Sequence, residues 1–355
     1  MTPKERFLAT MRHEPTDRVV TVYKGTEEVD EQLMKHFSVS NMDELLEAMG
    51  ADYVHWPYFP LYPQGFLDLK EEAEGVFCNN WGVRKKWATY DLGKYLETVE
   101  HPLANIESVS ELEDYPWPEP ADYDYSVVTD QAEKYGDRLA LGGGHCVFLE
   151  RCNELMGMEK TLTELLLNPQ LMEALIEKLF NIEMDYNRRI FKAAKGKIDI
   201  FDSGDDLGSQ TAPIMNPDTW RHFFKPYVKK MYDFAHQNKA YTKTHCDGQV
   251  TVFLPDFIEI GLNLFDPLMP LITAMDPYKL IPQYHTQLVF NGTIDTQGFL
   301  QNATVVQVKD EVQKQLSTFE PYGGFVLCPS HMIQPGTPLE NIIAIYDAVK
   351  VYYSC

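Results

Sequence analysis

The sequence predicts an α/β protein with parallel strands, most simply a (β/α)8 TIM barrel. Short apolar runs alternate with longer segments in which apolar residues recur every three or four positions, and this alternation is typical of parallel sheets covered by helices. About eight apolar runs fit a closed barrel. An open doubly wound sheet is the alternative, but no GxGxxG motif follows a strand to support it. The expected strands are 18–23, 52–56, 138–141, 198–201, 240–244, 262–265, 287–290 and 324–327.

Helices are expected between these strands. Helical spacing of apolar residues covers 161–180, 216–237 and 303–320. Two of the helices have clear starting points, Asn168-Pro169 and Asn216-Pro217, because Asn is a good N-cap and Pro suits the first helical position.

The segment from about 57 to 120 breaks the alternation and is rich in aromatic residues and proline. We expect a single barrel domain over residues 1–355, with this segment inserted after an early strand as a lid. A small sheet is expected around 75–90, and an extended connector at 115–120, because X-Pro steps disfavour helix. The aromatic side chains could pack the lid onto the barrel rim, line an apolar substrate pocket, or do both.

The composition limits the classes of partner. A net charge of -22 argues against nucleic acid and against an anionic membrane surface. It either keeps the protein soluble by self-repulsion or provides an acidic docking face. The amino terminus lacks the apolar core of a signal peptide, and no run reaches the ~18 apolar residues that span a bilayer. Six scattered cysteines without a CxxC pair indicate free thiols in a reducing cytoplasm.

Polar and ionisable residues follow most of the expected strands, at the barrel end where chemistry is found. Each has a simpler explanation. His145 could bond a backbone carbonyl, Asp205 and Asp206 could be loop carboxylates paired with amides, and Asp266 and Asn291 could form turns. Because such residues recur at five or six strand ends, we expect a shared site. The candidates for proton transfer are His145, Asp205 and Asp206, and those for substrate binding are Tyr23, Trp56, Tyr58, Asp266 and Asn291.

Two strand ends carry potential metal ligands. His245-Cys246-Asp247-Gly248 follows one strand, and Cys328-Pro329-Ser330-His331 follows another. Imidazole, thiolate and carboxylate all bind zinc, and a catalytic zinc keeps one position open beside three protein ligands. Alternate residues of an extended chain share a face, so His245 pairs naturally with Asp247. A bend at the strand end would allow Cys246 to replace Asp247, and either Cys328 or His331 could complete the set.

The chain resembles the uroporphyrinogen decarboxylase superfamily over nearly its whole length. The similar motifs are Pro3-Lys-Glu-Arg-Phe-Leu-Ala-Thr-Met with Pro15-Thr-Asp-Arg-Val, Tyr115-Pro-Trp-Pro, Asp205-Asp-Leu-Gly-Ser-Gln, His245-Cys-Asp-Gly and Ser330-His-Met-Ile-Gln-Pro-Gly-Thr-Pro-Leu-Glu-Asn. The resemblance implies an (α/β)8 barrel with its site at the carboxyl face. Members that decarboxylate porphyrinogens carry an arginine-rich motif near the amino terminus, where this chain has Val22-Tyr-Lys-Gly-Thr-Glu-Glu-Val.

The resemblance is closer to the corrinoid-linked methyltransferases of the superfamily. In the coenzyme M enzymes it implies zinc held by a His-x-Cys pair and a later Cys. On this chain the His matches His245, but the two Cys positions fall on Asp247 and His331. A His/Asp/His set is harder than a thiolate set and suits an oxygen or nitrogen substrate better than a soft thiol. This departure favours a methoxylated aromatic as methyl donor.

The resulting hypothesis is a zinc-dependent methyltransferase that moves a methyl group between a small methylated donor and cobalamin. The chain has no cobalamin motif of the Asp-x-His-x-x-Gly type, so a partner corrinoid protein must supply the cofactor. One alternative is a metal-free decarboxylase or lyase in which Asp205, Asp206 and His331 handle protons. Another is a barrel that binds a ligand or corrinoid protein without turnover. The sequence leaves a homodimer open.

Overall fold

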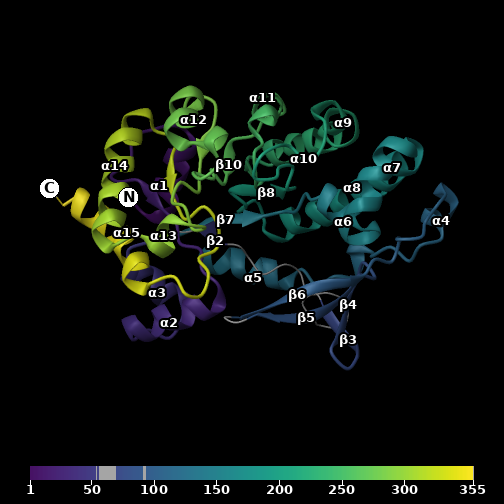
Figure 1. The fold of residues 1–355 in the computed structure, drawn as a ribbon, viewed down its shortest axis with the longest axis horizontal. Coiled ribbons are helices and arrows are strands. Elements are labelled where there is room, and N and C mark those ends of the chain that lie inside the picture. The colour runs from purple at the N-terminus through teal and green to yellow at the C-terminus, as the bar shows by residue number, and fades with distance from the viewer. Residues whose placement is uncertain (53, 56–68, 91–92, 355) are drawn as a thin grey trace.

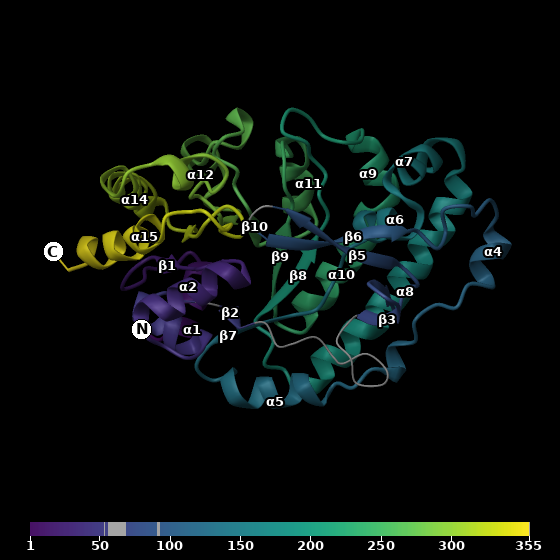
Figure 2. The same ribbon diagram turned by 60° about the horizontal axis from the view of Figure 1, so that its bottom comes forward.

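The computed structural model describes residues 1–52, 54–55, 69–90 and 93–354 (Figure 1). Within them the chain forms an α/β fold in which parallel strands alternate with helices. Figure 2 shows helices around the outside of the strands β7–β10. In the part of the chain described, no helix is both long and apolar enough to cross a membrane.

Each predicted strand range contains part of an observed parallel strand. Six strands pair in the order β11-β10-β9-β8-β7-β2, and β1 pairs with β12. Single parallel bridges join the two groups, from Val22 to Asp52 and from Phe290 to Phe325. Spatial order therefore follows chain order. The strands are β1 (Val20–Thr21), β2 (Val54–His55), β7 (Ala140–Gly143), β8 (Ile200–Gly204), β9 (Tyr241–His245), β10 (Leu264–Asp266), β11 (Val289–Phe290) and β12 (Val326–Leu327).

The inner faces of these strands share one buried cluster, which we call the sheet interior. It contains Val20, Ala140, Ile200, Leu264, Val289, Val326 and Cys328. The first helix, α1 (Pro3–Met11), adds Phe7 and Met11 to this cluster. A capping box between Thr2 and Glu5 begins α1 and satisfies two of its free amide groups.

The other helices pack their apolar faces into a second, larger core cluster. Helix α8 begins at Pro169 after Asn168, and α9 begins at Pro217 after Asn216, as predicted. The Asn216 side chain accepts a hydrogen bond from the Asp218 amide at 2.8 Å. The helices are α2 (Glu27–Phe37), α3 (Met42–Met49), α4 (Val109–Glu113), α5 (Ser126–Tyr135), α6 (Leu149–Met156), α7 (Met158–Leu167), α8 (Pro169–Ala193), α9 (Pro217–Phe223), α10 (Lys225–Gln237), α11 (Leu254–Glu259), α12 (Pro277–Tyr284), α13 (Phe299–Asn302), α14 (Val305–Phe319) and α15 (Leu339–Tyr352).

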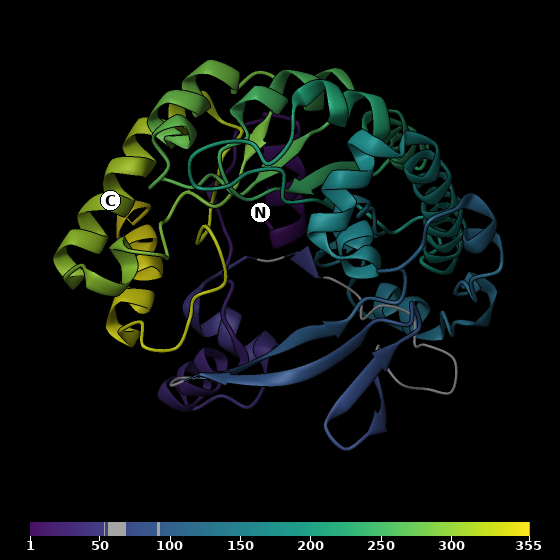
Figure 3. The same ribbon diagram turned by 45° about the vertical axis from the view of Figure 1, so that its right-hand side comes forward.

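A separate antiparallel sheet lies between β2 and β7 in the chain, in the segment where a small sheet is expected. It pairs β3 (Leu69–Ala73), β4 (Val76–Asn79), β5 (Arg84–Tyr90) and β6 (Gly93–Glu100) in sequence order. Figure 3 shows it as a layer apart from the parallel strands. An ion pair of 2.7 Å between Lys85 and Glu154 of α6 ties it to the body of the protein.

Candidate metal centre

Alternate side chains of β9 lie on one face of the strand, which runs from the sheet interior to the end of the strand. Tyr241 packs against the interior cluster, and Lys243 and His245 follow at steps of two, on the same face. Asp247 continues this spacing just beyond the strand. Gly248 follows with φ +90°, and a Cβ there would lie 2.3 Å from the backbone of Gly208. Glycine at this position therefore allows the β8 and β9 loops to touch beside the site.

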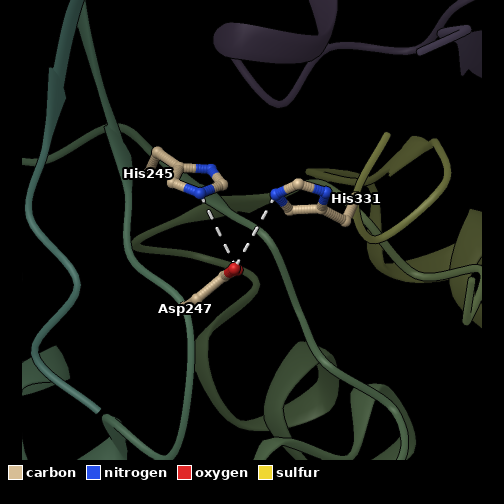
Figure 4. A group of neighbouring side chains, drawn as sticks. All are labelled: His245, Asp247 and His331. Atoms are coloured by element: carbon tan, nitrogen blue, oxygen red, sulfur yellow. Dashed lines mark ion pairs between the residues drawn. The ribbon is translucent and has the colours of Figure 1, made fainter. Parts of the chain in front are cut away.

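His245, Asp247 and His331 come together at the ends of β9 and β12. One ligand atom from each lies within 4.8 Å of the others. Nε2 of His245 is 3.8 Å from Oδ1 of Asp247, and Nε2 of His331 is 3.9 Å from Oδ2 (Figure 4). The two imidazole rings are 6.0 Å apart between centroids. Both histidines thus present a ring nitrogen to the same carboxylate.

This group fits a zinc ion. Ligand atoms bound at about 2.0–2.2 Å to a tetrahedral zinc lie roughly 3.3–3.6 Å from each other, a few tenths of an ångström less than the two distances from a histidine to Asp247. Oδ1 of Asp247 is buried and has no hydrogen-bond partner, a costly state that a metal ion would relieve. The side chains are 35%, 24% and 44% exposed in the order of the chain, so one side of the group is open to solvent.

Asp266 lies behind the His245, Asp247 and His331 group and is the centre of a buried charge network. Both of its carboxylate oxygens accept hydrogen bonds of 2.9 Å from Lys24. Asn291 donates to it at 3.1 Å, and Nζ of Lys243 lies 3.4 Å away. Burial acts to raise the pKa of Asp266, but Lys24 and Lys243 outweigh it and hold the pKa well below its ordinary value. The resulting carboxylate faces Nδ1 of His245 at 3.7 Å.

The structure gives Asp205 and Asp206 different surroundings. Asp205 accepts hydrogen bonds from the amides of Phe148 and Glu150 at the start of α6. Burial raises the pKa of Asp205 to about 7, although these bonds oppose the increase. Asp206 accepts a 2.8 Å hydrogen bond from the amide of Asp247. Asp206 therefore positions Asp247 of the candidate group, while Asp205 caps a neighbouring helix.

His145 is placed after β7, where it contacts α8. Its Nδ1 lies 3.0 Å from Oε2 of Glu183, and its backbone amide donates to Asn187 at 2.8 Å. Burial acts to lower the pKa of His145, but the Glu183 carboxylate outweighs it and raises the pKa above its ordinary value. The ring is outside the His245, Asp247 and His331 group.

The two cysteines considered as alternative ligands are both buried. Cys246 packs into the second, larger core cluster, and Cys328 packs into the sheet interior. Burial raises the pKa of Cys246 well above its ordinary value and that of Cys328 to about 12. Among the described residues, neither belongs to the group that could hold an ion.

The expected substrate-binding residues are placed as follows. Tyr23 is buried, with its ring against Tyr346 and its hydroxyl donating to Asp30 at 2.6 Å. Asp266 and Asn291 are buried beneath the His245, Asp247 and His331 group. Trp56 and Tyr58 lie outside the described residues.

Sequence reasoning did not identify Lys24 and Lys243. Lys243 pairs with Asp202 at 2.7 Å and approaches Asp266. Its position two residues before His245 in a β-prone run could have identified it, because a lysine on the inner face of a strand needs a charged partner. Lys24 had the same signal, two residues after Val22, which packs against the sheet interior.

Comparison with known proteins identifies the family of this chain. Residues 91–352 match the family described as Uroporphyrinogen decarboxylase (URO-D). The chain is 22% identical to the methylcobamide:CoM methyltransferase MtbA of Methanosarcina acetivorans, covering 99% of this chain and 98% of the relative. It is 24% identical to MtaA of Methanosarcina barkeri, covering 99% of each.

A solved structure shares the fold over the same length. The methyltransferase from Methanosarcina mazei superposes with a TM-score of 0.66 at 20% identity, covering 99% of both chains. The chain therefore belongs to the uroporphyrinogen decarboxylase family, and its full-length relatives place it on the corrinoid methyltransferase branch of that family.

Proposed function

We propose that this protein is a corrinoid-dependent methyltransferase with a zinc site formed by His245, Asp247 and His331. The observation that carries the proposal is the meeting of these three side chains around a buried carboxylate oxygen that has no hydrogen-bond partner. The full-length similarity to methylcobamide:CoM methyltransferases supports the reaction class. Zinc bound there would act as a Lewis acid and stabilise the oxygen that leaves the methyl group.

The residues around the site would keep these ligands in place. Asp266 faces Nδ1 of His245, which leaves Nε2 to face the metal, and metal-binding histidines commonly have such a carboxylate partner. Asp206 holds the backbone of Asp247. The exposed side of the group leaves space for the donor and for a cobalamin that a partner corrinoid protein presents. Among the residues considered for proton transfer, Asp205 is given no such role, because both of its carboxylate oxygens accept hydrogen bonds from amides at the start of α6.

The donor favoured by this ligand set is a methoxylated aromatic. Nitrogen and oxygen ligands make zinc harder than a thiolate set does, and a hard ion binds an ether oxygen better than a thiol. We also propose a single (β/α)8 barrel in which 57–120 forms a lid, located in the cytoplasm and able to form a homodimer. The two parallel bridges that connect the strand groups support the barrel.

The test mixes zinc-loaded protein with cob(I)alamin, prepared by chemical reduction, and a set of methoxybenzenes. The expected result is the appearance of the methylcobalamin absorption spectrum with at least one donor, and its loss in His245→Ala. Equal rates with and without protein for all donors would contradict the proposal. Zinc content, measured in parallel, should be close to one per chain in the wild type and low in His245→Ala.

A further inference from the structure

A cavity of about 320 Å³ extends from the sheet interior to α3, where Met42 and Leu46 line it. Ile200, Leu264 and Val326 line its apolar part, and these side chains come from β8, β10 and β12. The interior of a parallel barrel is normally filled by side chains in layers. A cavity of this size therefore departs from that layered packing and indicates a place for a ligand.

The polar end of the cavity lies next to the candidate metal centre. Lys24, Lys243 and Asn291 line this end, and each of them contacts Asp266, which faces His245. Lys243 also precedes His245 by two residues on the same face of β9, a separation of about 7 Å along a strand. The cavity thus begins one side chain below the metal ligands.

The direction of methyl transfer decides which part of the donor can occupy this space. The carbon–oxygen bond of the donor would break with its electron pair left on the oxygen, and a corrinoid presented by the partner would supply the electron pair of the new bond to the methyl carbon. The methyl acceptor would therefore lie on the side opposite the leaving oxygen. Because a partner protein can reach only the exposed side of the site, the rest of the donor must point inward.

We propose, building on the proposed function, that the sheet-interior cavity binds the donor's body, and that this body is a single substituted aromatic ring. An apolar cavity of ~150 Å³ holds benzene, so the larger space here accommodates one ring with a methoxy group. The ring would contact Ile200, Leu264 and Val326. The leaving oxygen would lie at the polar end of the cavity, next to the candidate metal centre, where zinc would stabilise the negative charge that it gains.

The experiment measures binding of 4-fluoroanisole by ¹⁹F NMR to zinc-loaded protein without any corrinoid. Val326→Phe and Ile200→Phe fill the cavity from two strands and should each weaken binding by about tenfold or more. Val289→Phe is the matched control, since Val289 is buried in the same interior cluster but is absent from the described cavity lining. It should change binding by less than about threefold. Zinc content and thermal unfolding verify that each variant is folded.

No binding by the wild type, equal loss in all three variants, or unchanged binding in Val326→Phe and Ile200→Phe would each overturn the proposal. A separate methyl-transfer assay distinguishes failure of the cavity proposal from failure of the proposed function. If methoxybenzenes methylate cob(I)alamin and the filled variants keep the wild-type KM, the cavity is wrong and the function stands. If 4-fluoroanisole binds as expected but no donor transfers its methyl group, the cavity stands and the function is wrong.

Discussion

Lys24 donates to both carboxylate oxygens of Asp266 at 2.9 Å, although 242 positions separate the two residues in the chain. The pair joins the end of β1 to the end of β10, directly behind His245. A charged contact this deep in the protein links the stability of the fold to the geometry of the candidate metal centre. Its removal should affect both.

Lys24→Met should weaken zinc binding by roughly 10–100-fold, because it loosens the carboxylate that orients His245. It should also reduce the free energy of unfolding by about 3 kcal/mol, since a buried carboxylate loses its main partner. Isothermal titration with zinc and urea denaturation measure the two effects. Lys229→Met is the control: its partner Asp233 is on the surface, and the change should cost less than about 0.5 kcal/mol. Wild-type zinc affinity in Lys24→Met would contradict the positioning role.

His331→Ala should lose most of the bound zinc, with affinity reduced by about 100-fold or more, because a three-ligand site loses one donor. Metal analysis after dialysis measures the zinc retained. His222→Ala removes a histidine whose side chain is 61% exposed and paired with Glu173 on the surface, and it should retain wild-type zinc. Equal retention in the two variants would exclude His331 as a ligand.

The pH dependence of stability should report the His145–Glu183 pair. The pKa of His145 in the folded protein lies above its ordinary value, with Glu183 outweighing burial and the repulsion of Arg151, and Asp202 acting in the same direction as Glu183. Protonated His145 therefore stabilises the fold fully below the ordinary value of about 6.5, and this contribution disappears as pH rises through the raised pKa.

The measurement compares Tm of the wild type and His145→Gln from pH 6 to 9. The difference in Tm between the wild type and His145→Gln should shrink as pH rises. The Tm of Glu183→Gln should depend on pH less than that of the wild type, as the Tm of His145→Gln does. A difference in Tm that stays constant or grows with pH would contradict the assigned direction.

Thr2→Ala removes the capping box of α1 and should cost about 1 kcal/mol of unfolding free energy. The cost matters because α1 places Phe7 and Met11 in the sheet interior. Thr318→Ala, on the exposed side near the end of α14, should change stability by less than about 0.5 kcal/mol. Equal effects in chemical denaturation would show that the box contributes little.

Local pattern in the sequence was sufficient for much of the fold. All eight predicted ranges overlap parallel strands, and the starts of α8 and α9 were located from Asn-Pro pairs. These features depend on periodicity and capping within a few residues, which the sequence shows directly. The proposed division into one barrel and a lid stays a prediction, as do Trp56 and Tyr58, which lie outside the described residues.

The alternation of side chains along an extended strand also favoured Asp247 over Cys246 as the partner of His245, with Cys246 left as the alternative if the strand end bends. What only the tertiary structure decided is how residues far apart in the chain meet. Asp205 and Asp206 are adjacent and chemically alike, yet one caps α6 and the other holds the amide of Asp247. The sequence by itself identified the ends of the strands where polar groups gather. Strand register and loop packing decided which of those groups face one another, because a shift of one residue turns a side chain to the opposite face.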